Sequence, residues 1–185
     1  MADTVVIGNR IPYRFFSTLG VGESDICTHA GSFHLALADA GIERYNVMKY
    51  SSIMPAIAEE VEKPIGYAHG SVLETIMAQV DVKHGERATA GIMYGWLHDR
   101  VTGDKFGGLV VEYMGHQKKK KAKQVLEQML EELYTARQSD FVSRFELRPG
   151  KTSIASIVPM KKYGTALVAL GFVEYIVPVI VEKKC

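Results

Sequence analysis

The stretch of residues 119–137 carries the pattern that most constrains the fold. Its apolar residues fall on one stripe at helical spacing, and the opposite face is charged. The stripe consists of Ala122, Val125, Leu126, Met129, Leu130 and Leu133. Segments rich in β-forming residues precede it at 89–97 and 107–114 and follow it at 153–158 and 167–181. Because an amphipathic helix must bury its stripe against another element, the sequence predicts one domain of mixed α and β structure.

The N-terminal half alternates the same two kinds of pattern. Residues 13–19 favour a strand, and the run Gly-Val-Gly-Glu-Ser-Asp at 20–25 predicts a strand end followed by a loop of the binding type. Apolar residues at helical spacing predict a helix over 31–40, which Gly41 would end in a left-handed conformation. Residues 46–50 then predict a short strand.

Composition excludes several classes of protein. The chain has 185 residues, of which 47% are hydrophobic and 23% charged, which is typical of a globular domain that buries its own core. Its formal net charge is +1, whereas nucleic-acid binding needs a concentrated basic surface. The lysine run at 118–121 is interpreted as a solvated helix face. We therefore expect no nucleic-acid partner.

Cysteine use and hydropathy indicate a cytoplasmic protein. Cys27 and Cys185 are too few for a secreted disulfide scaffold, so reduced thiols are expected. Residues 1–10 lack the basic and apolar regions of a signal peptide. The most apolar stretch, residues 166–181, contains Gly171, Glu174 and Pro178 and suits buried strands better than a membrane helix.

Common catalytic motifs are missing. Gly150-Lys151-Thr152 resembles the end of a phosphate-binding loop, but Phe145 stands where the first glycine is required. The six histidines include no pair at the spacing of a helical zinc site, so no metal is expected.

Two adjacent serines, Ser51 and Ser52, interrupt a β-forming run before the apolar residues 53–55. A serine hydroxyl lies beside its own peptide nitrogen, so an N-to-O acyl shift at Ser52 could convert the peptide bond into an ester. Elimination from Ser52 and hydrolysis would then leave a pyruvoyl group, a carbonyl cofactor made from the backbone. Since turns are rich in serine, the pair alone favours an ordinary turn.

The wider context changes that interpretation. The chain resembles the pyruvoyl-dependent arginine decarboxylases over nearly its whole length, with a first loop similar to that of the bacterial branch. The resemblance is carried by Asn46-x-x-x-x-Ser51-Ser52-Ile53-Met54-Pro55, by Gly108-Leu109-Val110-Val111-Glu112-Tyr113-Met114-Gly115 before the lysine-rich helix, and by Lys162-Tyr163-Gly164-x-Ala166.

The resemblance implies a single domain over residues 1–185, folded as a four-layer αββα sandwich of the α+β class. It implies a homotrimer or a pair of trimers, with active sites between protomers. Cleavage between Ser51 and Ser52 would yield a β chain of residues 1–51 and an α chain of residues 52–185 that begins with the pyruvoyl group. That group would decarboxylate L-arginine to agmatine through a Schiff base, without pyridoxal phosphate or metal.

The resemblance also assigns roles to individual residues. Glu112 would protonate the α-carbon after carbon dioxide leaves, although a strand glutamate could instead face solvent or pair with a cation. Asn46 would polarise the scissile carbonyl or hold the substrate carboxylate, or else cap a turn. Ser51 would line the site with its hydroxyl and new carboxylate, and the Leu37 carbonyl would accept from the substrate amine.

One position departs from the family pattern. The family holds the arginine side chain with an aspartate where this chain has His34, and an imidazole cannot pair with a guanidinium. Glu23, Asp25 or Asp39 could replace that aspartate. Alternatively, His34 marks a pocket for another amino acid or is a packed helix histidine, and the chain could also be an unprocessed, non-catalytic trimer subunit.

Overall fold

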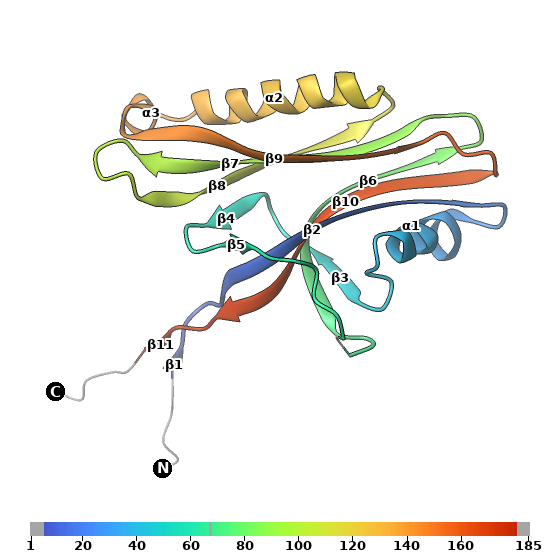
Figure 1. Ribbon diagram of the computed structural model, residues 1–185, viewed down its shortest axis with the longest axis horizontal. Helices are drawn as coiled ribbons and strands as arrows, with labels where there is room; N and C mark the ends of the chain where they lie inside the picture. The colour runs from blue at the N-terminus through green and yellow to red at the C-terminus, as the bar shows by residue number, and fades with distance from the viewer. Residues whose placement is uncertain (1–5, 67, 181–185) are drawn as a thin grey trace, which may run out of the picture.

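The computed structural model describes residues 6–66 and 68–180, which form one domain of four layers (Figure 1). The helical segments are η1 (Thr28–Phe33), α1 (His34–Asp39), α2 (Lys119–Thr135) and α3 (Ser139–Arg144). The strands are β1 (Val6–Ile7), β2 (Ile11–Ser24), β3 (Asn46–Lys49), β4 (Ile53–Pro55), β5 (Glu59–Glu60), β6 (Val72–Lys83), β7 (Ala88–Asp99), β8 (Lys105–Gly115), β9 (Phe145–Ile157), β10 (Tyr163–Ile176) and β11 (Val179–Ile180).

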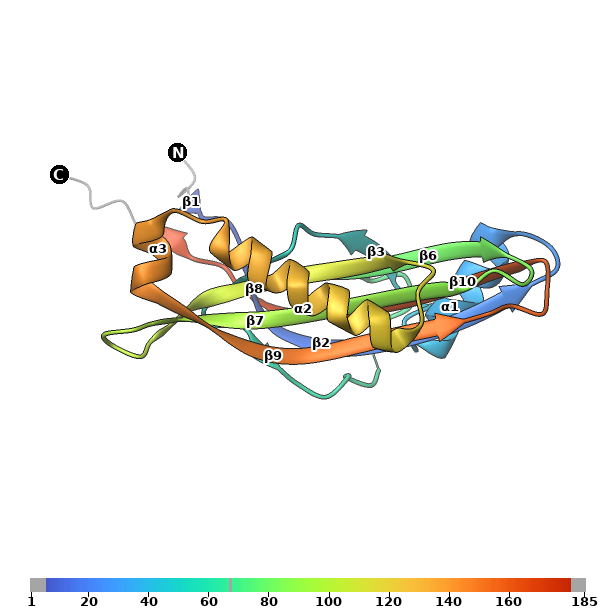
Figure 2. The same cartoon turned by 90° about the horizontal axis from the view of Figure 1, so that it is seen from above.

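Two sheets lie face to face between the helices. The five-stranded sheet has the order β3-β6-β10-β2-β5, and the four-stranded sheet has the order β4-β8-β7-β9. In Figure 1, η1 and α1 cover the outer face of the first sheet and α2 covers the outer face of the second. Figure 2 shows α2 running obliquely over β7, β8 and β9. The predicted αββα sandwich of the α+β class is therefore confirmed.

Three apolar cores separate the four layers. The core between the two sheets is the largest and centres on Phe15, Ile76, Ile92 and Phe172, with its members contributed by both sheets. A second core joins α1 to the first sheet, and a third joins α2 to the second sheet. Ala122, Leu126 and Leu130 of the predicted helical stripe are buried, and the two leucines lie in this third core, whereas Leu133 at the end of the stripe is exposed.

The loop predicted at 20–25 is wrong, because β2 continues to Ser24 and pairs with β10 along this stretch. The glycines serve close packing rather than a turn. A Cβ atom on Gly20 would lie 2.1 Å from the Ala36 carbonyl oxygen, and one on Gly22 would lie 2.3 Å from the Ser32 carbonyl oxygen. Glycine therefore lets the helical segment lie directly on the strand.

The sequence patterns did not predict strand β6, which lies between β3 and β10 inside the first sheet. One of its faces packs on α1 and the other faces the second sheet, so nearly every residue from Leu73 to Val82 is buried. A strand that is buried on both faces shows no alternation of polar and apolar residues, which explains why the pattern did not reveal it.

Within residues 6–66 and 68–180, no helix is long and apolar enough to cross a membrane. The same residues contain no group of three or more His, Cys, Asp or Glu side chains placed to hold a metal ion. Cys27 is a free thiol. The expectations for Cys185 and for the extreme N-terminus concern residues outside the described ranges.

Candidate active site

The Ser51–Ser52 peptide bond lies where the chain passes from one sheet to the other. Strand β3 forms an edge of the five-stranded sheet and ends at Lys49. Strand β4 forms an edge of the four-stranded sheet and begins at Ile53. Residues 50–52 therefore form a bridge that connects the edge of the five-stranded sheet to the edge of the four-stranded sheet.

Each side of this bridge is hydrogen-bonded to a different sheet. The Tyr50 backbone N–H donates to the Thr75 carbonyl oxygen of β6 at 2.7 Å. The Ser52 carbonyl oxygen accepts from the Val110 N–H of β8 at 3.2 Å. The peptide bond between Ser51 and Ser52 is thus fixed from both directions.

Ser52 and Glu112 are brought together by the fold. The Ser52 hydroxyl donates to Oε1 of Glu112 at 2.7 Å, and both residues are half-buried. The carbonyl oxygen of Ser51 accepts a hydrogen bond of 2.9 Å from the Ile53 N–H. A carboxylate that accepts from a hydroxyl can remove its proton, and an N–H that donates to a carbonyl can stabilise negative charge on that oxygen.

A pocket of about 460 Å³ opens beside these groups and is called the Ser52 pocket. It is lined by Ser52, Val110, Val111, Glu112, Met129, Glu132, Leu133 and Ala136. The wall from β8 and α2 is mostly apolar, so three polar side chains stand in a largely apolar setting. Such a setting strengthens interactions between charges and polar groups.

A second cavity of about 800 Å³ lies between α1 and β3 and is called the α1 groove. Its lining residues are His29, Ala30, Phe33, His34, Leu37, Glu43, Tyr45, Asn46, Val47, Lys49, Met77 and Gln79. Three residues that the resemblance assigns to substrate binding, His34, Leu37 and Asn46, therefore share one cavity.

The end of α1 shapes this groove. Gly41 has a φ of +67°, and the Ile42 N–H donates to the Leu37 carbonyl oxygen at 2.9 Å, which completes a Schellman motif. The Leu37 carbonyl thus has one hydrogen bond and a second lone pair. The Asn46 side-chain amide donates to the Gly70 carbonyl oxygen at 2.8 Å, which leaves the amide oxygen for another partner.

The groove and the Ser52 pocket are separate within the described chain. Asn46 begins β3, and Ser52 follows six residues later beyond the end of that strand. Extended backbone covers roughly 3.3 Å per residue, so the two Cα atoms lie up to ~20 Å apart. No residue lines both cavities. Ser51 is exposed at the bridge and lines neither of them.

The three carboxylates considered as replacements at position 34 have other partners. Glu23 accepts from the Met160 N–H at 2.7 Å, Asp25 from the Lys162 N–H at 3.2 Å, and Asp39 from the Val21 N–H at 2.9 Å. None of the three lines the α1 groove.

Sequence reasoning missed Glu43, which is the one carboxylate among the described residues that line the groove. Its Oε1 lies 3.6 Å from Nε of the neighbouring Arg44, and its side chain is 31% exposed. The available signal was its place three residues before Asn46, at the start of the connection between α1 and β3.

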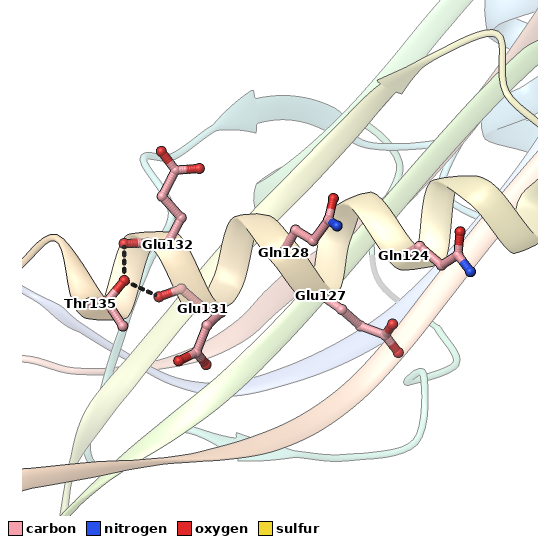
Figure 3. A pocket seen from close by; sticks show the side chains of 6 residues that line it. All are labelled: Gln124, Glu127, Gln128, Glu131, Glu132 and Thr135. Carbon is pink, nitrogen blue, oxygen red and sulfur yellow. Dashed lines mark hydrogen bonds between the residues drawn. The ribbon is translucent and has the colours of Figure 1, made fainter.

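A hollow on the outer side of α2 is lined by neither Ser51 nor Ser52. Figure 3 shows its lining side chains, Gln124, Glu127, Gln128, Glu131, Glu132 and Thr135. The Thr135 hydroxyl bonds to the carbonyl oxygens of Glu131 and Glu132 within the helix. These residues form the solvated face of an amphipathic helix. Only Glu132 also lines the Ser52 pocket.

Known proteins resemble this chain over most of its length. The family model described as pyruvoyl-dependent arginine decarboxylase matches residues 14–177. Pyruvoyl-dependent arginine decarboxylase AaxB of Chlamydia muridarum is 31% identical over 189 residues, which covers 91% of this chain and 94% of the relative. Pyruvoyl-dependent arginine decarboxylase of Thermococcus kodakarensis is 28% identical over 165 residues, covering 89% and 97%.

Proposed function

The chain belongs to the pyruvoyl-dependent arginine decarboxylase family, and from this premise we propose that it cuts itself between Ser51 and Ser52 and decarboxylates an amino acid with the resulting pyruvoyl group. One observation carries the proposal: the 2.7 Å hydrogen bond from the Ser52 hydroxyl to Glu112 beside a doubly held peptide bond. It joins a nucleophile to a base at the bond that must break.

The first step converts the peptide bond into an ester. The Ser52 hydroxyl oxygen attacks the Ser51 carbonyl carbon while Glu112 accepts the hydroxyl proton. The Ile53 N–H stabilises the charge that forms on the Ser51 oxygen. The carbon–nitrogen bond then breaks as the nitrogen takes up a proton, so no atom is lost at this stage.

The second step releases the β chain. Loss of the Ser52 Cα proton expels the Ser51 carboxylate from Cβ and leaves a carbon–carbon double bond. Cβ then takes up a proton to become a methyl group, and water replaces the nitrogen, which leaves as ammonia. The products are a β chain of residues 1–51 and an α chain whose first residue, derived from Ser52, has no amine.

The residues around Ser52 fit the group that this chemistry would create. When formed, the pyruvoyl carbonyl supplies the electron sink for the electrons released as carbon dioxide leaves. Glu112 then returns a proton to the substrate α-carbon, which requires the same short reach that it has to the Ser52 hydroxyl. The apolar side chains of Val110, Met129 and Leu133 limit the access of water.

The separation of the two cavities supports an active site shared between copies of the chain. The Ser52 pocket holds the reactive groups, whereas the α1 groove holds Asn46, Leu37 and His34. A head-to-tail contact that sets the pocket of one protomer on the groove of the next generates a closed ring when the rotation between successive protomers closes. We propose a homotrimer or a dimer of trimers, in which Asn46 holds the substrate carboxylate, the Leu37 carbonyl accepts from its amine and the Ser51 terminus completes the wall.

The proposed substrate is L-arginine, which would give agmatine and carbon dioxide. Glu43 supports this choice, because it brings a carboxylate into the groove that has His34 in place of an acidic residue. A carboxylate pairs with a guanidinium in two parallel hydrogen bonds. Asp25 is a weaker candidate, since it is exposed and accepts from the Lys162 N–H.

A second substrate class is favoured by other residues of the same groove. His34 and Lys49 line it together, and Nζ of Lys49 lies 3.5 Å from Oε1 of Gln79. An ammonium and an imidazole suit an amino acid with a neutral or acidic side chain better than a cationic one.

Two measurements test the proposal. Intact mass of the purified protein should give two fragments, with an α chain lighter by one ammonia than a chain that begins with serine. A single full-length chain would instead support a non-catalytic subunit. Release of carbon dioxide from each amino acid in turn identifies the substrate. Turnover of another amino acid without turnover of arginine would reject arginine and favour the second class.

A further inference from the structure

Glu74 is the one charged residue among the buried polar groups of the described chain. It lies on β6, and its residue surface is 2% exposed. Its side chain lies on the same strand face as Ile76 and Ala78, which belong to the core between the two sheets. A buried carboxylate is costly unless cations and hydrogen-bond donors surround it, so its partners matter.

Two side chains supply those partners. Arg10 forms an ion pair with Oε1 of Glu74, and the Tyr50 hydroxyl donates to Oε2. The Arg10 guanidinium also lies 5.1 Å from the centre of the Tyr175 ring, and burial raises the pKa of Tyr175. Both carboxylate oxygens are therefore satisfied, one by a residue of the N-terminal segment and one by Tyr50.

Tyr50 immediately precedes the Ser51–Ser52 pair. Its ring packs against Phe172, with ring centres 5.7 Å apart, and its backbone N–H donates to the Thr75 carbonyl. Consecutive residues of β6, Glu74 and Thr75, thus hold the side chain and the backbone of the same tyrosine. The Thr75 hydroxyl also donates to the Met48 carbonyl at 3.1 Å. These contacts restrict the rotation of Tyr50, which lies on the N-terminal side of the Ser51–Ser52 bond.

We propose that Tyr50, Glu74 and Arg10 form a clamp that positions the Ser51 carbonyl for attack by Ser52, an inference that rests on the proposed self-cleavage. An acyl shift needs the hydroxyl oxygen and the carbonyl carbon in near-attack geometry, and each source of disorder lowers the rate. The downstream side is held by the Val110 N–H and by Glu112. The clamp restrains the N-terminal side of the Ser51–Ser52 bond through contacts with the five-stranded sheet.

The same clamp acts after cleavage. The β chain then ends at Ser51, one residue beyond Tyr50, and a free chain terminus normally frays. The Tyr50 hydroxyl bond to Glu74 keeps this terminus beside the α chain, although no covalent bond connects the two any longer. Tyr50, Glu74 and Arg10 are positioning residues, since none of them contacts the reacting atoms.

Cleavage kinetics test the clamp. The chain is made by cell-free translation, and the uncut fraction is followed by intact mass with and without hydroxylamine, which cuts the ester. Tyr50→Phe keeps the ring on Phe172 and removes the hydroxyl, and we expect about tenfold slower cleavage under both conditions. Glu74→Gln keeps an acceptor for Tyr50 while Arg10, 55% exposed, can turn to solvent, so about threefold slowing is expected.

Tyr134→Phe is the matched control. Its hydroxyl is also lost from a buried site, where it donates to the Phe145 carbonyl at 2.7 Å, and Tyr134 belongs to the core between α2 and the second sheet and does not line the Ser52 pocket. It should lower the melting temperature and cleave at the wild-type rate.

The outcomes separate the two proposals. Wild-type rates for Tyr50→Phe, or slowing no greater than that of Tyr134→Phe, would overturn the clamp and leave self-cleavage standing. Wild-type rates in a folded Glu74→Gln variant would do the same. A wild-type chain that stays uncut would overturn the proposed function and the clamp with it.

Discussion

The hydroxyl of Ser52 and the carboxylate of Glu112 lie 2.7 Å apart, although 60 positions separate them in the sequence. Their meeting depends on β4 and β8, which pair in antiparallel register with Ile53 opposite Leu109. This register places Val110 opposite Ser52, and Glu112 follows two residues later on the same face of β8. A strand of only three residues therefore sets the distance between nucleophile and base.

This distance changes what is expected of Glu112. The family resemblance alone predicts that Glu112→Gln slows turnover and leaves cleavage intact. Because the carboxylate contacts the Ser52 hydroxyl, we expect Glu112→Gln to slow both cleavage and decarboxylation, each by roughly 100-fold or more. Intact mass over time measures the first and carbon dioxide release the second. Normal cleavage in Glu112→Gln would remove its role as base.

Ser52→Ala should abolish cleavage rather than slow it. Without the hydroxyl no ester can form, so the chain should remain a single full-length species however long it is incubated. Ser51→Ala is the matched control, since it removes the neighbouring hydroxyl and leaves the attacking one. A cut Ser52→Ala chain would refute the acyl shift.

Sequence patterns predicted α2 from its one solvated face, because its polar residues mark the exposed side of the stripe. The β7–β8 hairpin is largely buried on both faces and was predicted instead from its content of β-forming residues. Strand β6 escaped notice because Glu74, Thr75 and Gln79 interrupt its buried apolar run, and the continuation of β2 to Ser24 was hidden by glycines that serve helix packing. At the site, the residue types alone predict that Ser51 and Ser52 form an ordinary turn. Only the family resemblance linked Ser52 to Glu112, and Glu43 emerged only from the shape of the α1 groove.

Substitution of Glu43 tests the assignment of arginine. Glu43→Gln keeps the size of the side chain and removes the charge that would face the guanidinium, so the KM for arginine should rise by roughly 30-fold or more. Glu131→Gln, on the solvated face of α2 (Figure 3), is the control and should leave the KM unchanged. An unchanged KM in Glu43→Gln would show that the guanidinium is bound elsewhere.

Gly22 makes a prediction about stability. A Cβ atom there would lie 2.3 Å from the Ser32 carbonyl oxygen and 2.5 Å from the Ala36 nitrogen, both backbone atoms. Gly22→Ala should therefore push α1 away from β2 and cost about 3 kcal/mol or more in the free energy of unfolding. Gly8→Ala is the control, because its Cβ would meet Pro178 atoms at an ordinary 3.5 Å. Urea unfolding measures both.

Asp99 makes a prediction about pH. Hydrogen bonds from Arg144 and from the Val101 and Thr102 N–H groups lower the pKa of Asp99 below its usual 3.8. A lowered folded-state pKa stabilises the fold above the unfolded value, and that stability is lost as pH falls through the folded value. The difference in unfolding free energy between wild type and Asp99→Asn should therefore be constant near neutral pH and shrink below pH ~4. A difference as large at pH 2 as at neutral pH would contradict this.

Complementation between two inactive variants tests whether the active site is shared. Ser52→Ala keeps the α1 groove and cannot form the reactive group, whereas His34→Trp keeps Ser52 and fills the groove at an exposed position. If the Ser52 pocket of one copy works with the groove of the next, each variant alone is inactive. In an equal mixture, about one quarter of the interfaces join an intact pocket to an intact groove. Co-expression should then restore activity toward about a quarter of the wild-type level per site. Activity that stays at background in mixed assemblies, whose composition is verified by native mass, would place both halves of the site within one protomer.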